Sequence, residues 1–418
     1  MPDIPLTRSI PVPEGAIASM SKDSSRGWAV VAGAFIALLF SVGVLIVYSF
    51  GVLSTAIVTE FGWTNIQRST LFVAFSICSV IAGPVWGAVA DRAGARRVAI
   101  VSAVLLMLCF LALSGLPNNL VIAHAAFAAI GLFGAGTLPP TYACLVVGWF
   151  DRHRGLALGL TMIGVGAGAT ALPPIAAMIV TSYGWRELCI AYSLMVLIIS
   201  IPCAVLLLRA HPEQTMQQKK AGQPVMVTVK SAARQYRTWA LGIFALITGC
   251  ILVASVTNFV PLLQSRGETL VDAAKYQSIM GLSLIAGRLV GGALLDRIFA
   301  PRVVTAILLV TALGFFILNQ ANSSMAYVLA AVGIGLAIGL EIDFLAFIAS
   351  RYYDRAAFTT IFALFFAVYS LGATAGPPLF AWFLQTTGGY SFGLLTSSVL
   401  MLILSLTMFT LPRYEARS

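Results

Sequence analysis

Charged side chains are scarce in this sequence. Asp, Glu, Lys and Arg make up 10% of its 418 residues, whereas 59% are hydrophobic, and the mean hydropathy is +0.95. A soluble domain carries about a quarter charged residues, so this chain lacks the polar surface that a water-exposed globule needs. The composition excludes a disordered chain and a single-anchor enzyme with a large soluble domain. It predicts a membrane protein.

Metal-binding and disulfide patterns are also missing. The six cysteines lie within or at the edge of apolar segments without a Cys-x-x-Cys spacing, and the three histidines, at 124, 153 and 211, are scattered. These spacings favour neither disulfides nor zinc. We find no arrangement of residues typical of an active site. We therefore expect no metal, no cofactor and no enzymatic activity.

The apolar residues form runs that are long enough to cross a bilayer. A spanning helix needs about 20 apolar residues, and turn residues divide this chain into twelve such runs. The sequence therefore predicts an all-α membrane protein with twelve transmembrane helices. We place them at 27–56, 66–90, 97–116, 120–149, 155–182, 187–209, 239–264, 272–295, 301–319, 323–350, 356–384 and 391–411.

The positive charges predict the topology. With both termini on one side, the loops and tails of that side hold twenty Lys and Arg residues and the other side holds four, while Arg288 lies inside a span. Lys and Arg are enriched in cytoplasmic loops, so both termini are expected in the cytoplasm. The net charge of +10 then reflects topology and not a nucleic-acid-binding face. We expect an integral protein of the plasma membrane, which in a bacterium is the inner membrane.

Internal repeats indicate two related halves. The segment G-A-T-A-L-P-P at 168–174 returns as G-A-T-A-G-P-P at 372–378, and W-F-D-R at 149–152 matches Y-Y-D-R at 352–355. We expect a cytoplasmic tail (1–26), a six-helix bundle (27–209), a cytoplasmic linker (210–238), a second six-helix bundle (239–411) and a cytoplasmic tail (412–418). Parallel repeats of this kind place a substrate site at the midplane between the halves, which alternate in access by rocking.

The loop after the second span carries a recognisable motif. It reads G-A-V-A-D-R-A-G-A-R-R from position 87, and a weaker copy, G-A-L-L-D-R, begins at 292. This pattern resembles the signature of the major facilitator superfamily over essentially the whole chain. Its expected role is a conformational latch between the halves; the alternative is a basic loop that only enforces topology. The latch residues are Gly87, Asp91, Arg92, Gly94, Arg96, Arg97, Asp296 and Arg297.

Three further segments resemble the monocarboxylate porter branch and its bacterial oxalate/formate-type relatives. They are Y-S-F-G-V at 48–52, F-G-W at 61–63 and W-F-D-R-H-R-G-L-A-L-G at 149–159. The resemblance implies transport of organic anions, often with a proton. The chain departs from these relatives at three places: Leu284 replaces the aspartate one turn before the arginine of span 8, the first span lacks a lysine, and span 11 lacks one too.

Arg288 is the candidate anchor for an organic anion. It lies eight residues before Asp296, which places it about 12 Å from the membrane edge at 1.5 Å per residue. Charges inside a membrane are costly and mark functional sites by default, and the planar guanidinium matches a carboxylate. The monocarboxylate family has a matching arginine in span 8. A single fixed cation favours a monocarboxylate; the alternative is that Arg288 only pairs with an acid of span 10.

Two carboxylates of span 10, Glu341 and Asp343, are the candidate proton-coupling groups. A partly desolvated carboxylate can take up a proton near neutrality, and an anion that screens Arg288 would strengthen this uptake by linkage. The two residues project in different directions from one helix, so we expect one of them to face the cavity. A locked ion pair or a polar contact between helices remains the alternative.

Four uncharged residues complete the predicted substrate site. Each could donate a hydrogen bond to a carboxylate or hydroxyl group, although an aromatic side chain in a span more often serves packing. They are Tyr48, Tyr142, Asn258 and Tyr369.

The leading interpretation is therefore a secondary active transporter, a monomer in the lipid bilayer, that moves a small organic acid, most simply a monocarboxylate, by alternating access with protons. The alternative is an exporter of hydrophobic or cationic compounds by proton antiport, with Glu341 or Asp343 as the cation site. A sensor fits less well because the linker and tails are short, and a membrane-embedded enzyme fits less well because the sequence shows no catalytic arrangement of residues.

Overall fold

The structure is a computed structural model that describes residues 25–150, 153–209, 234–353 and 355–412, with side chains throughout except at positions 296 and 355–360. Twelve of its helical segments are long and apolar enough to cross a membrane, and the described residues contain no strand. The predicted all-α fold with twelve transmembrane helices is confirmed. The predicted tails and linker lie largely outside the described residues, and the second half begins with a helix at Tyr236.

Six of the spans belong to the first half. Two of them are broken by short π-helical turns, and the fourth by a 3-10 turn. The elements are α2 (Ser25–Leu39), η1 (Gly43–Tyr48), α3 (Phe50–Phe61), α4 (Asn65–Ala93), α5 (Ala95–Ser114), α6 (Leu120–Gly134), η2 (Ala135–Thr137), α7 (Pro139–Val147), α8 (Arg154–Ser182), α9 (Trp185–Met195), η3 (Val196–Ser200) and α10 (Ile201–Leu207).

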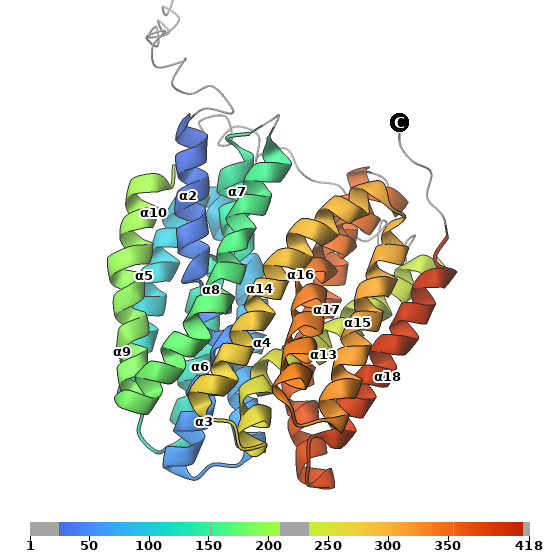
Figure 1. The fold of residues 1–418 in the computed structure, drawn as a ribbon. Helices are drawn as coiled ribbons and strands as arrows, with labels where there is room; N and C mark the ends of the chain where they lie inside the picture. Colours follow the sequence, from blue (N-terminus) through green and yellow to red (C-terminus); the bar gives the residue numbers. More distant parts are fainter. Residues whose placement is uncertain (1–24, 151–152, 210–233, 354, 413–418) are drawn as a thin grey trace, which may run out of the picture.

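The second half has longer, less interrupted helices. They are α13 (Tyr236–Ser265), α14 (Leu270–Arg297), α15 (Ala300–Gln320), α16 (Ser324–Tyr352), α17 (Arg355–Thr387) and α18 (Ser391–Thr407), followed by the short turn η5 (Met408–Thr410). Figure 1 shows the two halves side by side, with α8 and α14 adjacent at their junction. Because α2 begins and η5 ends on the same side of the bundle, we call this side the terminal face and the other the opposite face.

The repeated glycine motif has the same packing role in both halves. At Gly168 in α8, an added Cβ would lie 2.6 Å from the carbonyl oxygen of Leu39 in α2; at its counterpart Gly372 in α17, it would lie 2.0 Å from that of Leu246 in α13. In each half the motif therefore brings this helix against the first helix of the bundle. This shared contact supports the two-bundle architecture that the repeat predicted.

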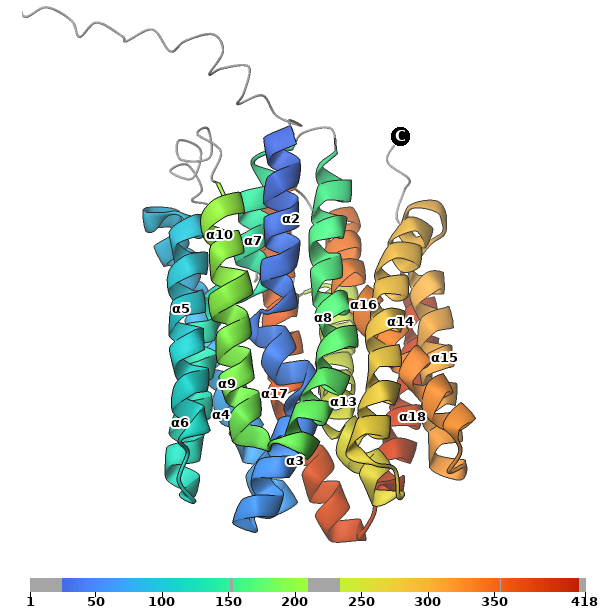
Figure 2. The same cartoon turned by 60° about the vertical axis from the view of Figure 1, so that its left-hand side comes forward.

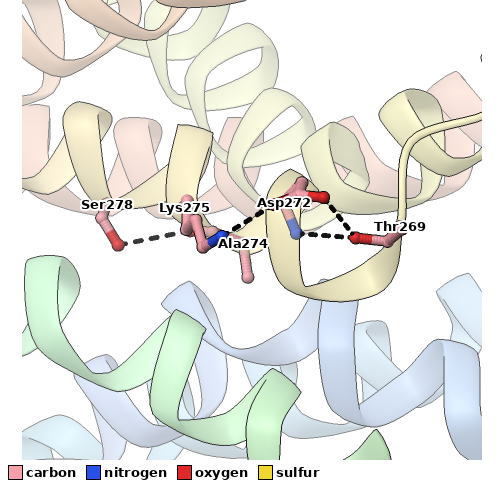
Figure 3. Close-up of polar contacts among 5 residues, drawn as sticks. All are labelled: Thr269, Asp272, Ala274, Lys275 and Ser278. Atoms are coloured by element: carbon pink, nitrogen blue, oxygen red, sulfur yellow. Dashed lines mark hydrogen bonds and ion pairs between the residues drawn. The ribbon is translucent and has the colours of Figure 1, made fainter.

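Local side-chain bonds fix where α14 begins. The Thr269 hydroxyl accepts a hydrogen bond from the Asp272 backbone N–H at 3.1 Å and donates to the Asp272 carboxylate at 2.7 Å (Figure 3). Lys275 pairs with the other oxygen of Asp272 at 2.8 Å, and one turn further Ser278 donates to the Ala274 carbonyl. A cap of this kind satisfies N–H groups that a helix end leaves free.

The two halves touch in the part of the molecule away from the terminal face and at mid-depth. Helix α4 meets α17 through a hydrogen bond between the Ser76 and Thr374 hydroxyls at 2.6 Å. Helix α14 meets α8 where an added Cβ at Gly281 would lie 2.5 Å from the Thr170 nitrogen, and where one at Gly166 would lie 2.3 Å from Ile285. Both helix pairs are therefore in close contact at that level.

The same helix faces have no neighbour nearer the terminal face. Residues seven or eleven positions apart lie on one side of an α-helix, about two or three turns from each other. Gly83 and Gly87 lie on the face of α4 that carries Ser76, and an added Cβ at either would meet nothing within 4 Å. The same holds for Gly155 and Gly159 on the face of α8 that carries Gly166, and for Gly292 on the face of α14 that carries Gly281. The halves therefore diverge toward the terminal face. Figure 2 also shows the ribbons of α8 and α14 separating from each other in that direction.

The close contact at Gly372 gives a test of the packing. A Gly372→Ala change would place a methyl carbon 2.0 Å from a backbone oxygen of α13, and such overpacking costs about 1–3 kcal/mol. We expect a lower apparent Tm in a thermal shift assay of the detergent-solubilised protein. Gly242→Ala in α13 is the matched control: its Cβ meets nothing, so the better helix propensity of alanine should leave Tm unchanged or higher. Equal effects of the two changes would contradict this packing.

Candidate functional site

Arg288 lies in α14 at the junction of the two halves. Its Nε donates a hydrogen bond to Asp343 Oδ2 of α16 at 3.1 Å, and its Nη1 donates to the Met162 carbonyl of α8, in the other half, at 3.3 Å. The Arg288 side chain is 15% exposed and the Asp343 side chain 38%. A buried charge needs a partner and further hydrogen bonds, and Arg288 finds them on both halves.

Close packing of α14 on α16 brings this pair together. An added Cβ at Gly287 would lie 2.5 Å from the Leu336 carbonyl, and one at Gly339 would lie 2.3 Å from the Leu284 carbonyl and 2.9 Å from the Arg288 nitrogen. Glycine allows helix backbones in a membrane to approach in this way. The glycines of α16 therefore act as packing residues and set the distance over which Arg288 reaches Asp343.

Glu341 takes a separate position, two residues earlier in α16. Its side chain is buried, and Oε1 accepts a hydrogen bond from the Tyr369 hydroxyl of α17 at 2.8 Å, while Oε2 is buried without a hydrogen-bond partner. Of the two span 10 carboxylates, Asp343 is thus the accessible one, and Glu341 is enclosed between α16 and α17. Both carboxylates interact electrostatically with Arg288.

Tyr48 joins the same cluster from the first half. It ends the π-helical turn η1, a type of irregularity that occurs often at functional sites. Its phenol is buried and interacts electrostatically with Arg288, Glu341 and Tyr369. Its carbonyl accepts a hydrogen bond from Gln277 Nε2 of α14 at 2.8 Å, which adds a contact between the halves.

The structure thus gathers five of the seven residues predicted for substrate and proton binding: Arg288, Tyr48, Tyr369, Glu341 and Asp343. They form one cluster of a single cation, two carboxylates and two phenols, supplied by both halves. Chemically, Arg288 can pair with another carboxylate in place of Asp343, and the Tyr48 hydroxyl can donate a hydrogen bond to it, while that of Tyr369 is used by Glu341.

The other two predicted substrate ligands lie elsewhere. Tyr142 is buried in an apolar cluster of the first half, together with Val30, Leu145 and Ala157. Asn258 of α13 is buried too, but its Oδ1 accepts a hydrogen bond from Arg68 Nη2 at 2.5 Å. Neither contacts Arg288 through a hydrogen bond in the described residues, so their role as substrate ligands stays a prediction.

Arg68 is a buried charge that the sequence does not reveal. The charge count places it at the outer edge of the predicted span 66–90, whereas it lies in the first turn of α4 and is 2% exposed. The signal is weak because the continuous apolar run of this span begins only at Leu71. Gln277 escapes notice for a similar reason: a single glutamine in a polar turn of α14 carries no charge signal.

The predicted latch residues are spread along the terminal face. Asp91, Arg92, Arg97 and Arg297 are exposed, and Arg96 donates to the Val205 carbonyl at 2.6 Å within its own half. In the described part of the chain Asp91 forms no ion pair, and Gly87 and Gly94 have open space around them. The side chain of Asp296 lies outside the described residues. The latch is therefore not engaged within the described residues.

The described residues contain no group of three or more His, Cys, Asp or Glu side chains that could hold a metal ion.

Sequence comparisons give a consistent family assignment. The family model of the Major Facilitator Superfamily matches residues 30–360. Monocarboxylate transporter 13 of Rattus norvegicus is 25% identical over 399 residues, which cover 94% of this chain and 90% of the relative. Monocarboxylate transporter 11 of Homo sapiens is 25% identical over 419 residues, with coverage of 97% and 88%.

Solved structures with the same fold are also membrane transporters. A bacterial homologue of the human lysosomal transporter Spinster, in an inward-facing and unoccupied conformation, superposes with a TM-score of 0.71 at 14% identity and covers 92% of this chain and 96% of its own. A D-xylose–proton symporter has the same TM-score and identity, with coverage of 92% and 97%. At this identity the likeness concerns the fold alone.

Proposed function

The chain belongs to the major facilitator superfamily, and we propose that it carries a small organic anion, a monocarboxylate, across the membrane with Arg288 as the anchor of the carboxylate group. Its family consists of solute carriers and not of enzymes. The observation that carries the proposal is the position of Arg288, which contacts the Met162 carbonyl of one half and Asp343 of the other. A ligand on Arg288 would sit where both halves can respond to it.

The charge of the cluster favours an anion with one carboxylate. Arginine is always protonated and presents its N–H groups in a fork that fits a carboxylate. Arg288 is the one cation of the cluster, so a second carboxylate on the substrate would be buried without a partner at a high cost. The names of the two relatives, both monocarboxylate transporters, support the same substrate class.

Proton coupling follows from the pair that occupies Arg288. Without substrate, the Asp343 carboxylate neutralises the guanidinium at 3.1 Å. When a substrate carboxylate replaces it, Asp343 is left as a partly buried anion unless it takes up a proton, because desolvation disfavours an unpaired charge. One proton and one monoanion therefore enter together, and the loaded site stays as neutral as the empty one. Tyr48 donates a hydrogen bond to the bound acid, and Glu341, which accepts the single O–H of Tyr369, is the second candidate for the proton.

The orientation follows from the distribution of charge. The described cations of the terminal face include Arg92, Arg97, Arg154 and Arg297, all exposed, and Lys and Arg prefer the cytoplasmic side. The terminal face is then cytoplasmic, in a plasma membrane, and the structure is closed to the outside and open to the inside. The motif residues Asp91, Arg92, Gly94, Arg96 and Arg97, with Asp296 and Arg297 in the second half, act as a latch when the cytoplasmic side closes.

Removal of the anchor tests the anion site. We expect Arg288→Ala to lower saturable uptake of radiolabelled monocarboxylates into proteoliposomes by about 30-fold or more, because loss of one partner of a buried charge contact costs roughly 2–5 kcal/mol. A panel of aliphatic and aromatic mono- and dicarboxylates should show preference for one carboxylate. Arg302→Ala, an exposed arginine of α15, is the control and should transport like the wild type.

Normal uptake by Arg288→Ala, or no uptake of any acid by the wild type, would refute the anion site. Competition of a lipophilic cation for the transport site would then favour the exporter of hydrophobic or cationic compounds, provided that Asp343→Asn or Glu341→Gln abolishes this competition.

Neutralisation of Asp343 tests the coupling. An asparagine at this position could not take up a proton, and Arg288 would lose its competing carboxylate. We therefore expect Asp343→Asn to keep exchange of internal for external substrate but to lose accumulation driven by an inward proton gradient. Asp272→Asn, which removes the acid that pairs with Lys275 near the start of α14, should keep both. If Asp343→Asn still accumulates substrate in a proton gradient, the proton site is assigned to Glu341 instead. Glu341→Gln should then lose the gradient-driven accumulation.

The latch is tested through the side that it closes. Asp91 is exposed without an ion pair in the described residues, so its loss should leave the present state unaffected and weaken only the state closed to the cytoplasm. In a cysteine-free background with Gly159→Cys, a position open in this structure, Asp91→Asn should raise the rate of maleimide labelling several-fold. Glu187→Gln on the opposite face should leave it unchanged. An unchanged labelling rate with Asp91→Asn would contradict the latch and leave the motif as a basic loop that only enforces topology.

A further inference from the structure

Arg68 forms a second polar contact between the halves, separate from the Arg288 cluster. It lies in the first turn of α4 and is 2% exposed, and its Nη2 donates to Asn258 Oδ1 of α13. Close to it, an added Cβ at Gly51 of α3 would lie 3.3 Å from the Thr257 carbonyl, so the two halves are in contact here. Arg68 thus lies within the seal of the opposite face.

The guanidinium of Arg68 is not satisfied in this closed position. Its Nε and Nη1 are buried without a hydrogen-bond partner. A buried charge with unmet donors is costly, and the backbone N–H groups at the start of α4 add positive potential at the same place. Such a position favours a negative charge near Arg68.

The described surroundings supply no such charge. Arg68 interacts electrostatically with Tyr390 and forms no ion pair in the described residues. Burial raises the pKa of the Tyr390 phenol, although Arg68 acts in the opposite direction. The hydrogen-bond acceptor of Arg68, the Asn258 amide, is neutral as well.

Arg68 lies at a different depth of the bundle from Arg288. Asn258, its partner, lies two residues beyond Val256 in α13, and the Val256 carbonyl accepts a hydrogen bond from Gln277. Gln277 and Arg288 are eleven residues apart in α14, about 16 Å at 1.5 Å per residue. Arg68 therefore marks a different depth of the path, near its outer end.

We propose that Arg68 is a second carboxylate-binding residue, which receives the substrate anion at the outer gate when the halves part on that side and returns to Asn258 when they close. The inference rests on the proposed function and extends it from the central site to the entry of the substrate.

The geometry of the guanidinium makes the two partners of Arg68 compete. A carboxylate binds arginine through two parallel N–H groups, and each available edge, Nε with Nη2 or Nη1 with Nη2, includes the nitrogen that donates to Asn258. Nη2 carries one N–H group on each edge, and Asn258 Oδ1 accepts from one of them. A carboxylate on the edge that Asn258 occupies displaces Asn258, so anion binding there opposes closure of the gate, and release of the anion inward allows it.

The test measures the separation of the two halves on the outer side and does not measure transport. Nitroxide labels at Gly115→Cys and Asn322→Cys, exposed positions of the opposite face in the two halves, report their separation by pulsed electron spin resonance in a cysteine-free background. All variants also carry Arg288→Ala, so that the central site cannot bind the probe. The probe is sodium acetate, with sodium chloride at the same concentration as the second arm.

Acetate should increase the population with the longer distance several-fold when Arg68 is present, because a ligand shifts the equilibrium toward the state that it binds better. Arg68→Gln should abolish this response. An equal response in Arg68→Gln, or none with Arg68 intact, would overturn the proposal. A response to chloride as large as that to acetate would assign the residue to inorganic anions and overturn its carboxylate role.

A second variant keeps Arg68 and removes its competitor. Asn258→Ala takes away the hydrogen-bond acceptor of Arg68 in the closed gate, so the longer distance should be more populated even without acetate, and half-saturation should need less acetate. Unchanged distances and an unchanged acetate response would overturn the proposal even if Arg68→Gln does not fold. Because every variant lacks Arg288, failure here is distinguishable from failure of the central anion site.

Discussion

The ion pair between Arg288 and Asp343 is the interaction on which the central site depends. An arginine at mid-depth in a membrane is tolerated only where protein groups replace its hydration, and here a carboxylate of α16 and a carbonyl of α8 do so. The pair therefore ties together two demands. It stabilises a charge in an apolar bundle, and it holds that charge with a carboxylate, which in the proposed function a substrate carboxylate replaces.

The helix packing around the pair serves the same purpose. Glycines bring the backbones of α14 and α16 into contact next to Arg288, so the carboxylate reaches the guanidinium without a long, flexible side chain. Tyr369 holds the neighbouring carboxylate, Glu341, on α17. Of the two acids, one is thus restrained by a phenol and the other is left to the arginine, which gives them different tasks although they are only two residues apart.

The fold was largely predictable from the sequence, because its evidence is distributed along the whole chain. Twelve apolar runs and a repeat with six identities in seven residues cannot arise from one local feature, and the structure has the same twelve spans and the same packing of both repeat copies. Arg288 and the two acids of span 10 were predictable for a related reason: a charge in an apolar run is conspicuous.

The partners within the site were less predictable, since they depend on which helices meet. Helical spacing alone suggested that Glu341 and Asp343 point apart, but it could not tell that α17 would provide Tyr369 for the first and α14 Arg288 for the second. Arg68 was concealed by its place in the first turn of a span, where an arginine ordinarily indicates a membrane edge.

The departure from the animal carriers gains a physical explanation from this arrangement. Leu284 stands where those carriers have an aspartate one turn before the arginine, on the same helix, and the carboxylate next to Arg288 comes from α16 instead. A pair within one helix keeps its geometry when the helix moves, whereas a pair between two helices depends on their contact. Exchange of Asp343 for a substrate carboxylate would therefore also release a link between α14 and α16, while the contact of Arg288 with Met162 connects the same event to the other half. In the proposed mechanism, charge balance and movement of the halves thus meet at one guanidinium.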